Sequence, residues 1–280
     1  MSFGFHVGLQ KTLYQTVSSH DQVKAIQCYI GGRQSFARRT FTEPDIDRTT
    51  DYLNAKRISL YIHACLCLNL ASGKEEVLDS MIDELNAVRE VGASTVFHIG
   101  SQNVSGQPTG TLDQIVTMIK RIGVQVRTRD NPLWQGTSRY QRYPLLLENA
   151  AGEGAKFGST LSDLTYLFQE LKEEGVGLCL DTAHAFGAGL FDFQTPDSID
   201  RMFTTLDQHI GLERLQLIHI NDSKVKFGGK ADRHESLAKG YIWGEKQDGL
   251  FYLIQQCRKR GIDMILETPT PLEDYLKFLT

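Results

Sequence analysis

Residues 175–182 read GVGLCLDT and residues 215–222 read LQLIHIND, and each segment is an apolar run with a polar side chain near its end. Continuous apolar runs of this length are typical of parallel strands that are buried on both faces. Six further segments have the same β-rich character, and we expect strands at 3–8, 23–30, 58–64, 94–100, 143–149 and 263–269.

Helical patterns separate most of these strands. Segment 74–92 has apolar residues at the spacing of one helix face, 160–175 begins with a threonine and closes at a glycine, and 251–261 ends in Lys and Arg before a glycine. Eight alternating units favour a (β/α)₈ TIM barrel, an α/β fold, over an open doubly wound sheet. No GxGxxG follows the first strand, so a dinucleotide-binding fold has no support. We expect a single domain over residues 1–280, with a long polar and basic loop at 125–142 on the catalytic side.

Composition limits the function only mildly. The formal net charge of −4 argues weakly against DNA binding, because such domains often carry a basic surplus. Metal ions bound by acidic residues would weaken that objection. No apolar run is long enough to span a membrane and no leader is visible, so we expect an intracellular protein that is not secreted. The five cysteines are odd in number and form no CxxC pair, and we expect reduced core residues: Cys28, Cys65, Cys67, Cys179 and Cys257.

Histidines and carboxylates stand at the ends of six consecutive expected strands. In a TIM barrel these strand ends meet at one rim, where the chemistry takes place. Any one such residue could be a hydrogen-bonded core histidine or a helix cap, but nine together beside apolar strands would leave costly bare charge unless metals bind there. The candidate ligands are His63, His98, Glu148, Asp181, His184, His219, Asp232, His234 and Glu267.

Nine ligands exceed what one zinc ion needs, since zinc usually takes four. Imidazole and carboxylate together suit zinc, with manganese or iron also open. Glu148 can bridge two ions, and a pair of ions fits hydrolytic phosphate chemistry.

Several motifs resemble one known family. They are HIGS (98–101), LLLENAAGEG (145–154), LCLDTAHAFGAG (178–189), HINDSKVKFGGKADRH (219–234) and ILETP (265–269). On these segments the chain resembles endonuclease IV, the class II apurinic/apyrimidinic endonucleases, from His63 nearly to the C-terminus. The resemblance implies a TIM barrel with a trinuclear zinc site at the carboxyl-terminal rim of the strands, in which manganese or iron could replace one zinc. It also implies base-excision repair of duplex DNA that contains abasic sites, by a monomer.

The resemblance also implies roles for the nine positions. His63 and His98 would bind the first zinc, with Glu148 bridging to the second, whose other ligands would be Asp181, His219 and Glu267. The third site would be His184, Asp232 and His234. A zinc-bridged hydroxide, positioned by Glu148 as the catalytic residue, would cut the phosphodiester bond 5′ to the abasic site. The products would be a 3′-hydroxyl and a 5′-deoxyribose phosphate; accessory 3′-phosphatase, 3′-diesterase or exonuclease activities stay open.

Contacts to DNA are less clear from the sequence. The segment GGRQSFARR (31–39) matches the place of a DNA-penetrating loop in the family, although a solvated basic loop is the alternative. Leu66 can be a wedge between base steps or part of the core. His6 can be structural, lie behind the metal ligands or contact a phosphate. Trp243 can face DNA or anchor its loop. The candidate DNA contacts are Arg33, Gln34, Arg38, Leu66, Lys224, Lys226, Phe227 and Arg233.

Two other functions fit part of the pattern. Glu148, Asp181, His219 and Glu267 alone resemble the one-metal site of sugar isomerases and epimerases with the same barrel, but five further ligands have no purpose in that chemistry. A metal-bearing DNA-binding protein without catalysis is the second alternative. It would bind the lesion tightly without cutting it.

Overall fold

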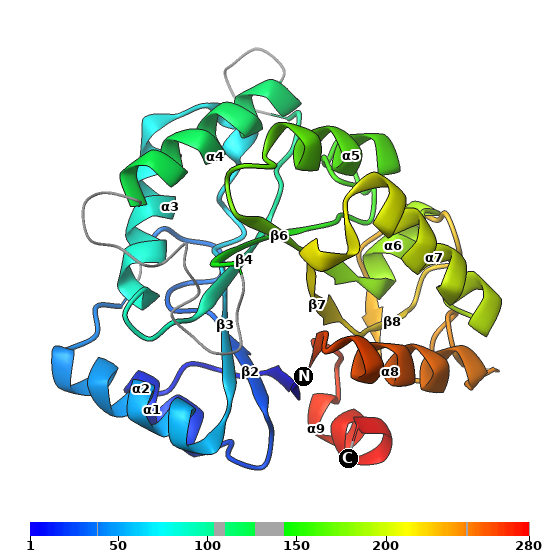
Figure 1. Ribbon diagram of the computed structural model, residues 1–280, viewed down its shortest axis with the longest axis horizontal. Coiled ribbons are helices and arrows are strands. Elements are labelled where there is room, and N and C mark those ends of the chain that lie inside the picture. Colours follow the sequence, from blue (N-terminus) through cyan, green and yellow to red (C-terminus); the bar gives the residue numbers. More distant parts are fainter. Residues whose placement is uncertain (38, 104–109, 127–142, 245, 280) are drawn as a thin grey trace.

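The structure is a computed structural model, and it describes the chain except residues 38, 104–109, 127–142, 245 and 280. Eight parallel strands close into a barrel in the order β1-β10-β7-β6-β5-β4-β3-β2, with helices around it (Figure 1). The barrel strands are β1 (Phe3–His6), β2 (Ala25–Cys28), β3 (Ser59–His63), β4 (Ser94–His98), β5 (Leu145–Glu148), β6 (Val176–Asp181), β7 (Leu215–His219) and β10 (Asp263–Leu266). The predicted TIM barrel is therefore confirmed, and each predicted strand contains an observed one.

Helices follow the strands along the chain and form the outer layer (Figure 1). They are α1 (Leu13–Ser18), α2 (Glu43–Lys56), α3 (Glu75–Val88), α4 (Leu112–Val126), α5 (Leu161–Glu170), α6 (Thr182–Ala188), α7 (Pro196–His209), α8 (Asp248–Arg260) and α9 (Pro271–Asp274), which continues into a π-helical turn (Tyr275–Leu279). Short 3₁₀ turns lie at Leu70–Ser72 and Leu212–Arg214. Between β7 and α8 a small antiparallel pair is formed by β8 (Asp222–Ser223) and β9 (His234–Glu235).

Local sequence explains several helix boundaries. The Thr195 side chain accepts a hydrogen bond from the Ser198 amide, and the Ser198 side chain accepts one from the Thr195 amide. This is a capping box ahead of α7, with Pro196 in its first turn. Thr160 caps α5 in the same way through the Asp163 amide. Gly261, with a φ of 73°, ends α8, as its position after Lys and Arg predicts. Helix α4 continues through Val126, so the first two residues of the predicted 125–142 loop are helical instead, and residues 127–142 lie outside the described part.

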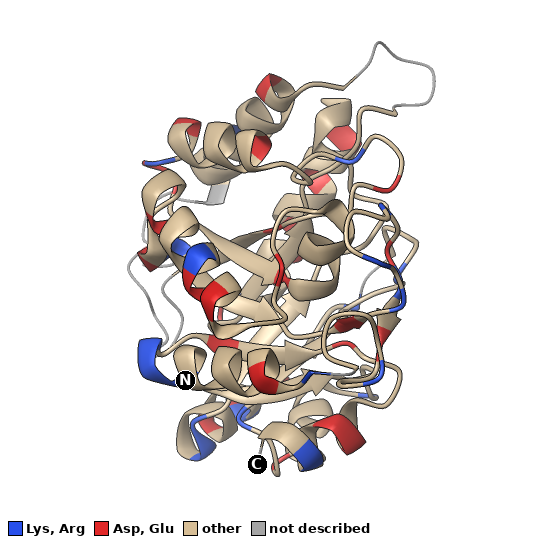
Figure 2. Ribbon diagram, turned by 90° about the vertical axis from the view of Figure 1, so that its right-hand side faces the viewer, with Lys and Arg blue, Asp and Glu red and all other residues tan. Residues whose placement is uncertain are grey.

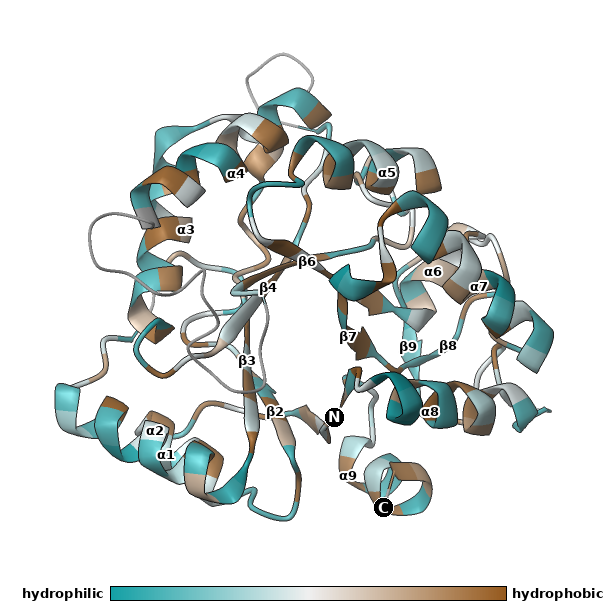
Figure 3. Ribbon diagram, viewed as in Figure 1, coloured by the Kyte–Doolittle hydropathy of each residue, from teal (hydrophilic) through white to brown (hydrophobic). Residues whose placement is uncertain are grey.

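The core has two parts. One side-chain cluster fills the inside of the barrel and takes one residue from each of seven strands: Ala25, Tyr61, Val96, Leu146, Cys179, Leu217 and Ile265. A larger cluster packs the strands against the helices. Figure 3 shows hydrophobic strands inside and hydrophilic outer faces on the helices, and Figure 2 shows charges of both signs mixed over helices and loops.

Four of the five cysteines are buried, as predicted, but Cys67 is exposed. The prediction was wrong there because β3 ends at His63, so the apolar run that follows leaves the barrel wall and turns onto the rim. The described residues contain no helix that is long and apolar enough to cross a membrane.

Candidate metal centre

A ring of polar side chains lies directly above the inner core of the barrel. Each inner residue is followed two positions later by a polar residue on the same strand face, because strand side chains alternate with a period of two. Leu146 thus precedes Glu148, and Leu217 precedes His219. The complete ring is His6, Gln27, His63, His98, Glu148, Asp181, His219 and Glu267. Six of these eight are predicted ligands.

The first ligand group lies over β3, β4 and β5 and consists of His63, His98 and Glu148. One carboxylate oxygen of Glu148, Oε2, lies 3.3 Å from Nε2 of His63 and 3.6 Å from Nε2 of His98. Glu148 is only 1% exposed, so its charge is held away from water between the two rings.

The second group shares Glu148 and adds Asp181, His219 and Glu267 from β6, β7 and the end of β10. Nδ1 of His219 lies 3.2 Å from Oε1 of Glu148 and 3.2 Å from Oε2 of Glu267. The two oxygens of Glu148 therefore face different ligand groups, which is the arrangement expected of a bridging carboxylate.

The third group is made by Asp181, His184 and His234. Nε2 of His234 lies 3.4 Å from Oδ2 of Asp181. Asp232 adjoins this group, with Oδ1 at 3.1 Å from Nε2 of His184 and 3.5 Å from Nε2 of His234. All nine predicted ligands thus come together, and Asp181 stands between the second and third groups.

Hydrogen bonds to the far side of four imidazoles fix which nitrogen faces the centre. Nδ1 of His63 pairs with the Ala64 carbonyl at 2.8 Å, and Nδ1 of His184 pairs with the Asn149 carbonyl at 3.0 Å. Nδ1 of His234 lies 3.3 Å from the Glu267 carbonyl, and Nε2 of His219 lies 2.9 Å from Oε1 of Gln27. Such partners orient metal-binding histidines and leave the other nitrogen free to bind.

The atoms left at the centre fit metal ligands. Glu148 Oε2, His184 Nε2 and His234 Nε2 face the centre and are buried without a well-aligned hydrogen bond among the described residues, although oppositely charged groups lie 3.1–3.6 Å from them. Two ligands held about 2.05 Å from a tetrahedral zinc ion would lie about 3.3 Å apart. Several separations at the centre, 3.1–3.6 Å, match that spacing, while Asp181 lies farther from His219, at 3.9 Å. Buried polar atoms without a well-aligned hydrogen bond are costly unless a metal binds them.

The buried carboxylates of the ligand groups also require positive charge beside them. Burial opposes charge on every group, yet His98 and His219 hold the pKa of Glu148 well below its usual value. Burial likewise opposes a charged His184, but Asp181, Asp232 and Glu148 raise its pKa to about 10. Burial lowers the pKa of His98 to about 4, so that ring is neutral at pH 7, the form in which imidazole binds metals. The carboxylates at the centre therefore need positive charge, supplied by protons or by metal ions.

A cavity of about 430 Å³ opens over these ligands. Of the predicted DNA contacts, Arg33, Leu66, Lys224 and Arg233 line it. Arg233 also lies 3.6 Å from Glu153.

The other predicted DNA contacts do not line this cavity. Gln34, Lys226 and Phe227 are exposed, and the Phe227 ring packs edge-on against Phe186 with centroids 5.2 Å apart. Arg38 lies outside the described residues.

Four residues of the site went unassigned in the sequence or were left open. Gln27 and His6 belong to the polar ring, and Gln27 donates to Oε1 of Glu267 at 2.6 Å. Tyr29 stacks obliquely on His6 and His63, with centroids 4.8 and 5.0 Å away, and Lys156 lies 3.9 Å from Asp232. The first two could have been found by applying the two-residue step to the first two strands; Tyr29 and Lys156 carry no such signal.

The relatives of the chain are consistent with this geometry. Residues 19–278 match the family described as a xylose isomerase-like TIM barrel. The probable endonuclease 4 of a Sulfurihydrogenibium species is 30% identical over 96% of this chain and 93% of its own length. The crystal structure of endonuclease IV from Thermus thermophilus has a TM-score of 0.77 and 25% identity, covering 99% of this chain and 96% of that one. A D-tagatose 3-epimerase-like protein has a TM-score of 0.66 at 17% identity, covering 99% and 94% of the two chains, which is a likeness of fold alone.

Proposed function

Since the chain belongs to the endonuclease IV family of xylose isomerase-like TIM barrels, we propose that it is a DNA-repair endonuclease that cuts duplex DNA at abasic sites. It hydrolyses the phosphodiester bond 5′ to the lesion and leaves a 3′-hydroxyl and a 5′-deoxyribose phosphate. The observation that carries the proposal is the set of three adjoining ligand groups at the rim, two of which share Glu148.

The residues present fit three zinc ions, with manganese or iron as the alternative at one site. His63, His98 and Glu148 would hold the first ion and Glu148, Asp181, His219 and Glu267 the second. His184, Asp232 and His234 would hold the third. When bound, ions in such sites lower the pKa of water and polarise phosphoryl oxygens.

The protein's own side chains position the substrate. Glu148 fixes the spacing between two ligand groups, since each of its oxygens faces one of them. Arg33, Lys224 and Arg233 supply positive charge at the cavity wall for the phosphates beside the lesion. Leu66 offers an apolar edge against base pairs.

Selection of the lesion follows from the cost of entering the cavity. An abasic sugar has no base to unstack, so swinging it out of the duplex costs less than extruding an intact nucleotide. The cavity of about 430 Å³ lies over the ligands, where the extruded sugar would bring its 5′ phosphate.

A one-metal sugar epimerase explains less of the site. That chemistry would use Glu148, Asp181, His219 and Glu267, and would leave the two other ligand groups, which contain His63, His98, His184 and His234, without a purpose.

Incision of a duplex oligonucleotide with one abasic-site analogue, in magnesium-free buffer, tests the proposal, with an intact duplex as control. Cutting 5′ to the lesion only, with a 3′-hydroxyl product, is the expected result. Absence of cutting by protein that holds about three zinc ions would overturn it in favour of a binding protein. A protein that holds one metal ion and does not cut would point to sugar isomerisation.

A further inference from the structure

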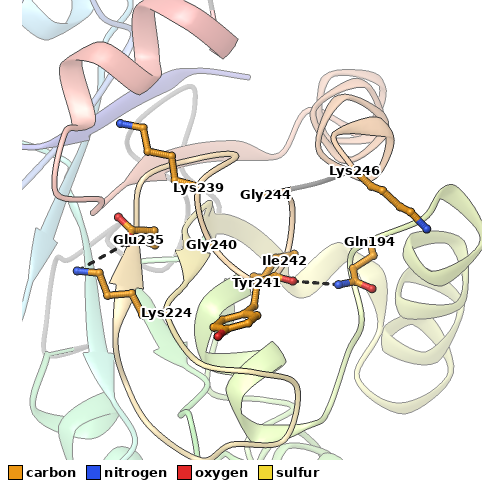
Figure 4. A pocket seen from close by; sticks show the side chains of 9 residues that line it. All are labelled: Gln194, Lys224, Glu235, Lys239, Gly240, Tyr241, Ile242, Gly244 and Lys246. Atoms are coloured by element: carbon orange, nitrogen blue, oxygen red, sulfur yellow. Dashed lines mark hydrogen bonds and ion pairs between the residues drawn. The ribbon is translucent and has the colours of Figure 1, made fainter.

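A second, larger cavity of about 680 Å³ lies beside the site described so far and, of the described residues, shares only Lys224 with its lining (Figure 4). It is lined by Gln194, Lys224, Glu235, Lys239, Gly240, Tyr241, Ile242, Gly244 and Lys246. Lys224 lines both cavities, so the two adjoin at this residue. Strand β9 joins them as well, because its first residue, His234, is a predicted ligand and its second, Glu235, lines the new cavity.

The floor of this cavity is a rigidly built loop. The buried carboxylate of Asp222 accepts hydrogen bonds from the amides of Gly240 at 3.0 Å and Ile242 at 2.9 Å. The Tyr241 amide donates to the Ser223 carbonyl at 2.7 Å. A methyl group added to Gly240 would lie 2.4 Å from Asp222, so the loop packs closely onto the carboxylate that holds it.

The loop buries one aromatic ring and exposes another. Trp243 is fully buried and its indole N–H donates to the Phe193 carbonyl at 2.8 Å, so it anchors the loop. Tyr241 is 50% exposed, and the Gln194 side-chain amide donates a hydrogen bond to the Tyr241 backbone carbonyl at 2.9 Å. A preorganised loop that holds an exposed aromatic ring is a feature of binding surfaces.

The charge around Tyr241 is positive. Figure 4 shows Lys224, Lys239 and Lys246 on different sides of the cavity, and the Lys226 ammonium lies 5.8 Å from the centre of the Tyr241 ring. Lys224 is 4.0 Å from Glu235, but Lys239 and Lys246 form no ion pair with any residue that the structure describes.

We propose that this lysine groove binds the backbone of the DNA flank on one side of the lesion, as an extension of the substrate site. The inference rests on the proposed function. Three lysines around one groove match the regular negative charge of a phosphodiester chain. The shared residue Lys224 places the groove beside the cavity over the ligand groups, within reach of one duplex. Tyr241 offers a flat surface for a base or sugar in that groove.

The test compares Lys239→Ala/Lys246→Ala with a control pair that loses the same charge elsewhere. Lys172 and Lys259 suit the control, since both are exposed and lie at the carboxyl-terminal ends of α5 and α8, away from the rim. Binding is measured by fluorescence anisotropy over a salt series, with metal-loaded protein. The probes are three duplexes already nicked 5′ to an abasic site. One has two long flanks, and each of the other two is truncated close to the lesion on one side, the two probes on opposite sides.

The groove variant should bind the long duplex more weakly, and the slope of log K against log salt should become shallower by about 1.8, because each lost phosphate contact removes about 0.9. The binding defect should disappear on only one of the two truncated duplexes, the one that lacks the flank in the groove. The control pair should bind all three duplexes like wild type. Tyr241→Ala should weaken binding to the duplexes on which the lysine variant is defective, but should leave the slope of log K against log salt unchanged.

Equal defects on all three duplexes, or a control pair as weak as the groove variant, would overturn the groove. Because the probes are already cut, the test does not depend on incision. Wild-type protein that binds the probes with the predicted flank dependence but never cuts an abasic duplex would contradict the proposed function and leave the groove standing.

Discussion

Replacing Glu148 by glutamine tests the assignment at the centre of the site. The change keeps size and shape but removes a charge whose oxygens lie 3.2–3.6 Å from three histidine nitrogens in two ligand groups. At 3.2 Å and an effective dielectric constant of about 20, a unit positive charge interacts with this carboxylate by about 5 kcal/mol. That energy corresponds to a factor of about 10³ to 10⁴ in an equilibrium or rate constant, so we expect metal affinity and incision rate to fall together by about that factor.

The assay is single-turnover incision of an abasic duplex, beside metal content measured by mass spectrometry. Glu170→Gln is the matched control, because it makes the same chemical change at the end of α5, where Glu170 is 48% exposed and is in none of the ligand groups. An E148Q protein that keeps its full metal content and nearly normal incision would refute the reasoning, since the shared carboxylate would then have no function at the centre.

Three further changes probe the surroundings of the site. Gln27→Leu removes the acceptor for His219 Nε2 and the donor to Glu267 Oε1, and should lower metal affinity about 10- to 100-fold in a chelator competition. The buried partners left unpaired should also cost about 1–3 kcal/mol of stability each; unaltered metal affinity would contradict an orienting role. Metal binding must displace the proton of His184, whose pKa Asp181 and Asp232 raise to about 10 against the effect of burial. Affinity should therefore increase with pH from about 6 to about 8, by about tenfold per unit for each proton released. Calorimetry in buffers of different ionisation enthalpy measures this release, and binding without it would argue against the assignment. Gly4→Ala should destabilise the fold by about 3 kcal/mol in urea denaturation, because its methyl group would lie 1.6 Å from the Ala25 carbonyl oxygen; stability like that of wild type would mean that the barrel relaxes there.

The barrel and most of the candidate metal centre could be predicted because one physical rule leaves a pattern for both in the sequence. A strand buried on both faces is a continuous apolar run, so a histidine or carboxylate at its end is conspicuous. His63, Glu148 and His219 stand out in this way. Each also follows an inner core residue by two positions, and the barrel closes these strand ends into one ring.

Gln27 and His6 obey the same rule but were harder to interpret. Gln27 is uncharged, and a buried amide has many possible partners, so its type does not indicate a metal site. Only the closed barrel brings it within 2.9 Å of His219 and 2.6 Å of Glu267, which lie 192 and 240 residues away in the chain.

The surfaces beyond the rim are the least predictable, and GYIWG (240–244) shows why. Nothing in the order of its residues says that Trp243 is buried and Tyr241 exposed, since either ring could face a ligand. The choice is made by Asp222, whose carboxylate gathers the loop amides, and by the Phe193 carbonyl, which receives the indole N–H. Both contacts join segments that are far apart in sequence, so a surface built by loops depends on the three-dimensional partners of the backbone. The groove beside Tyr241 is therefore a property of the folded chain, whereas the candidate metal ligands are already visible at the ends of its strands.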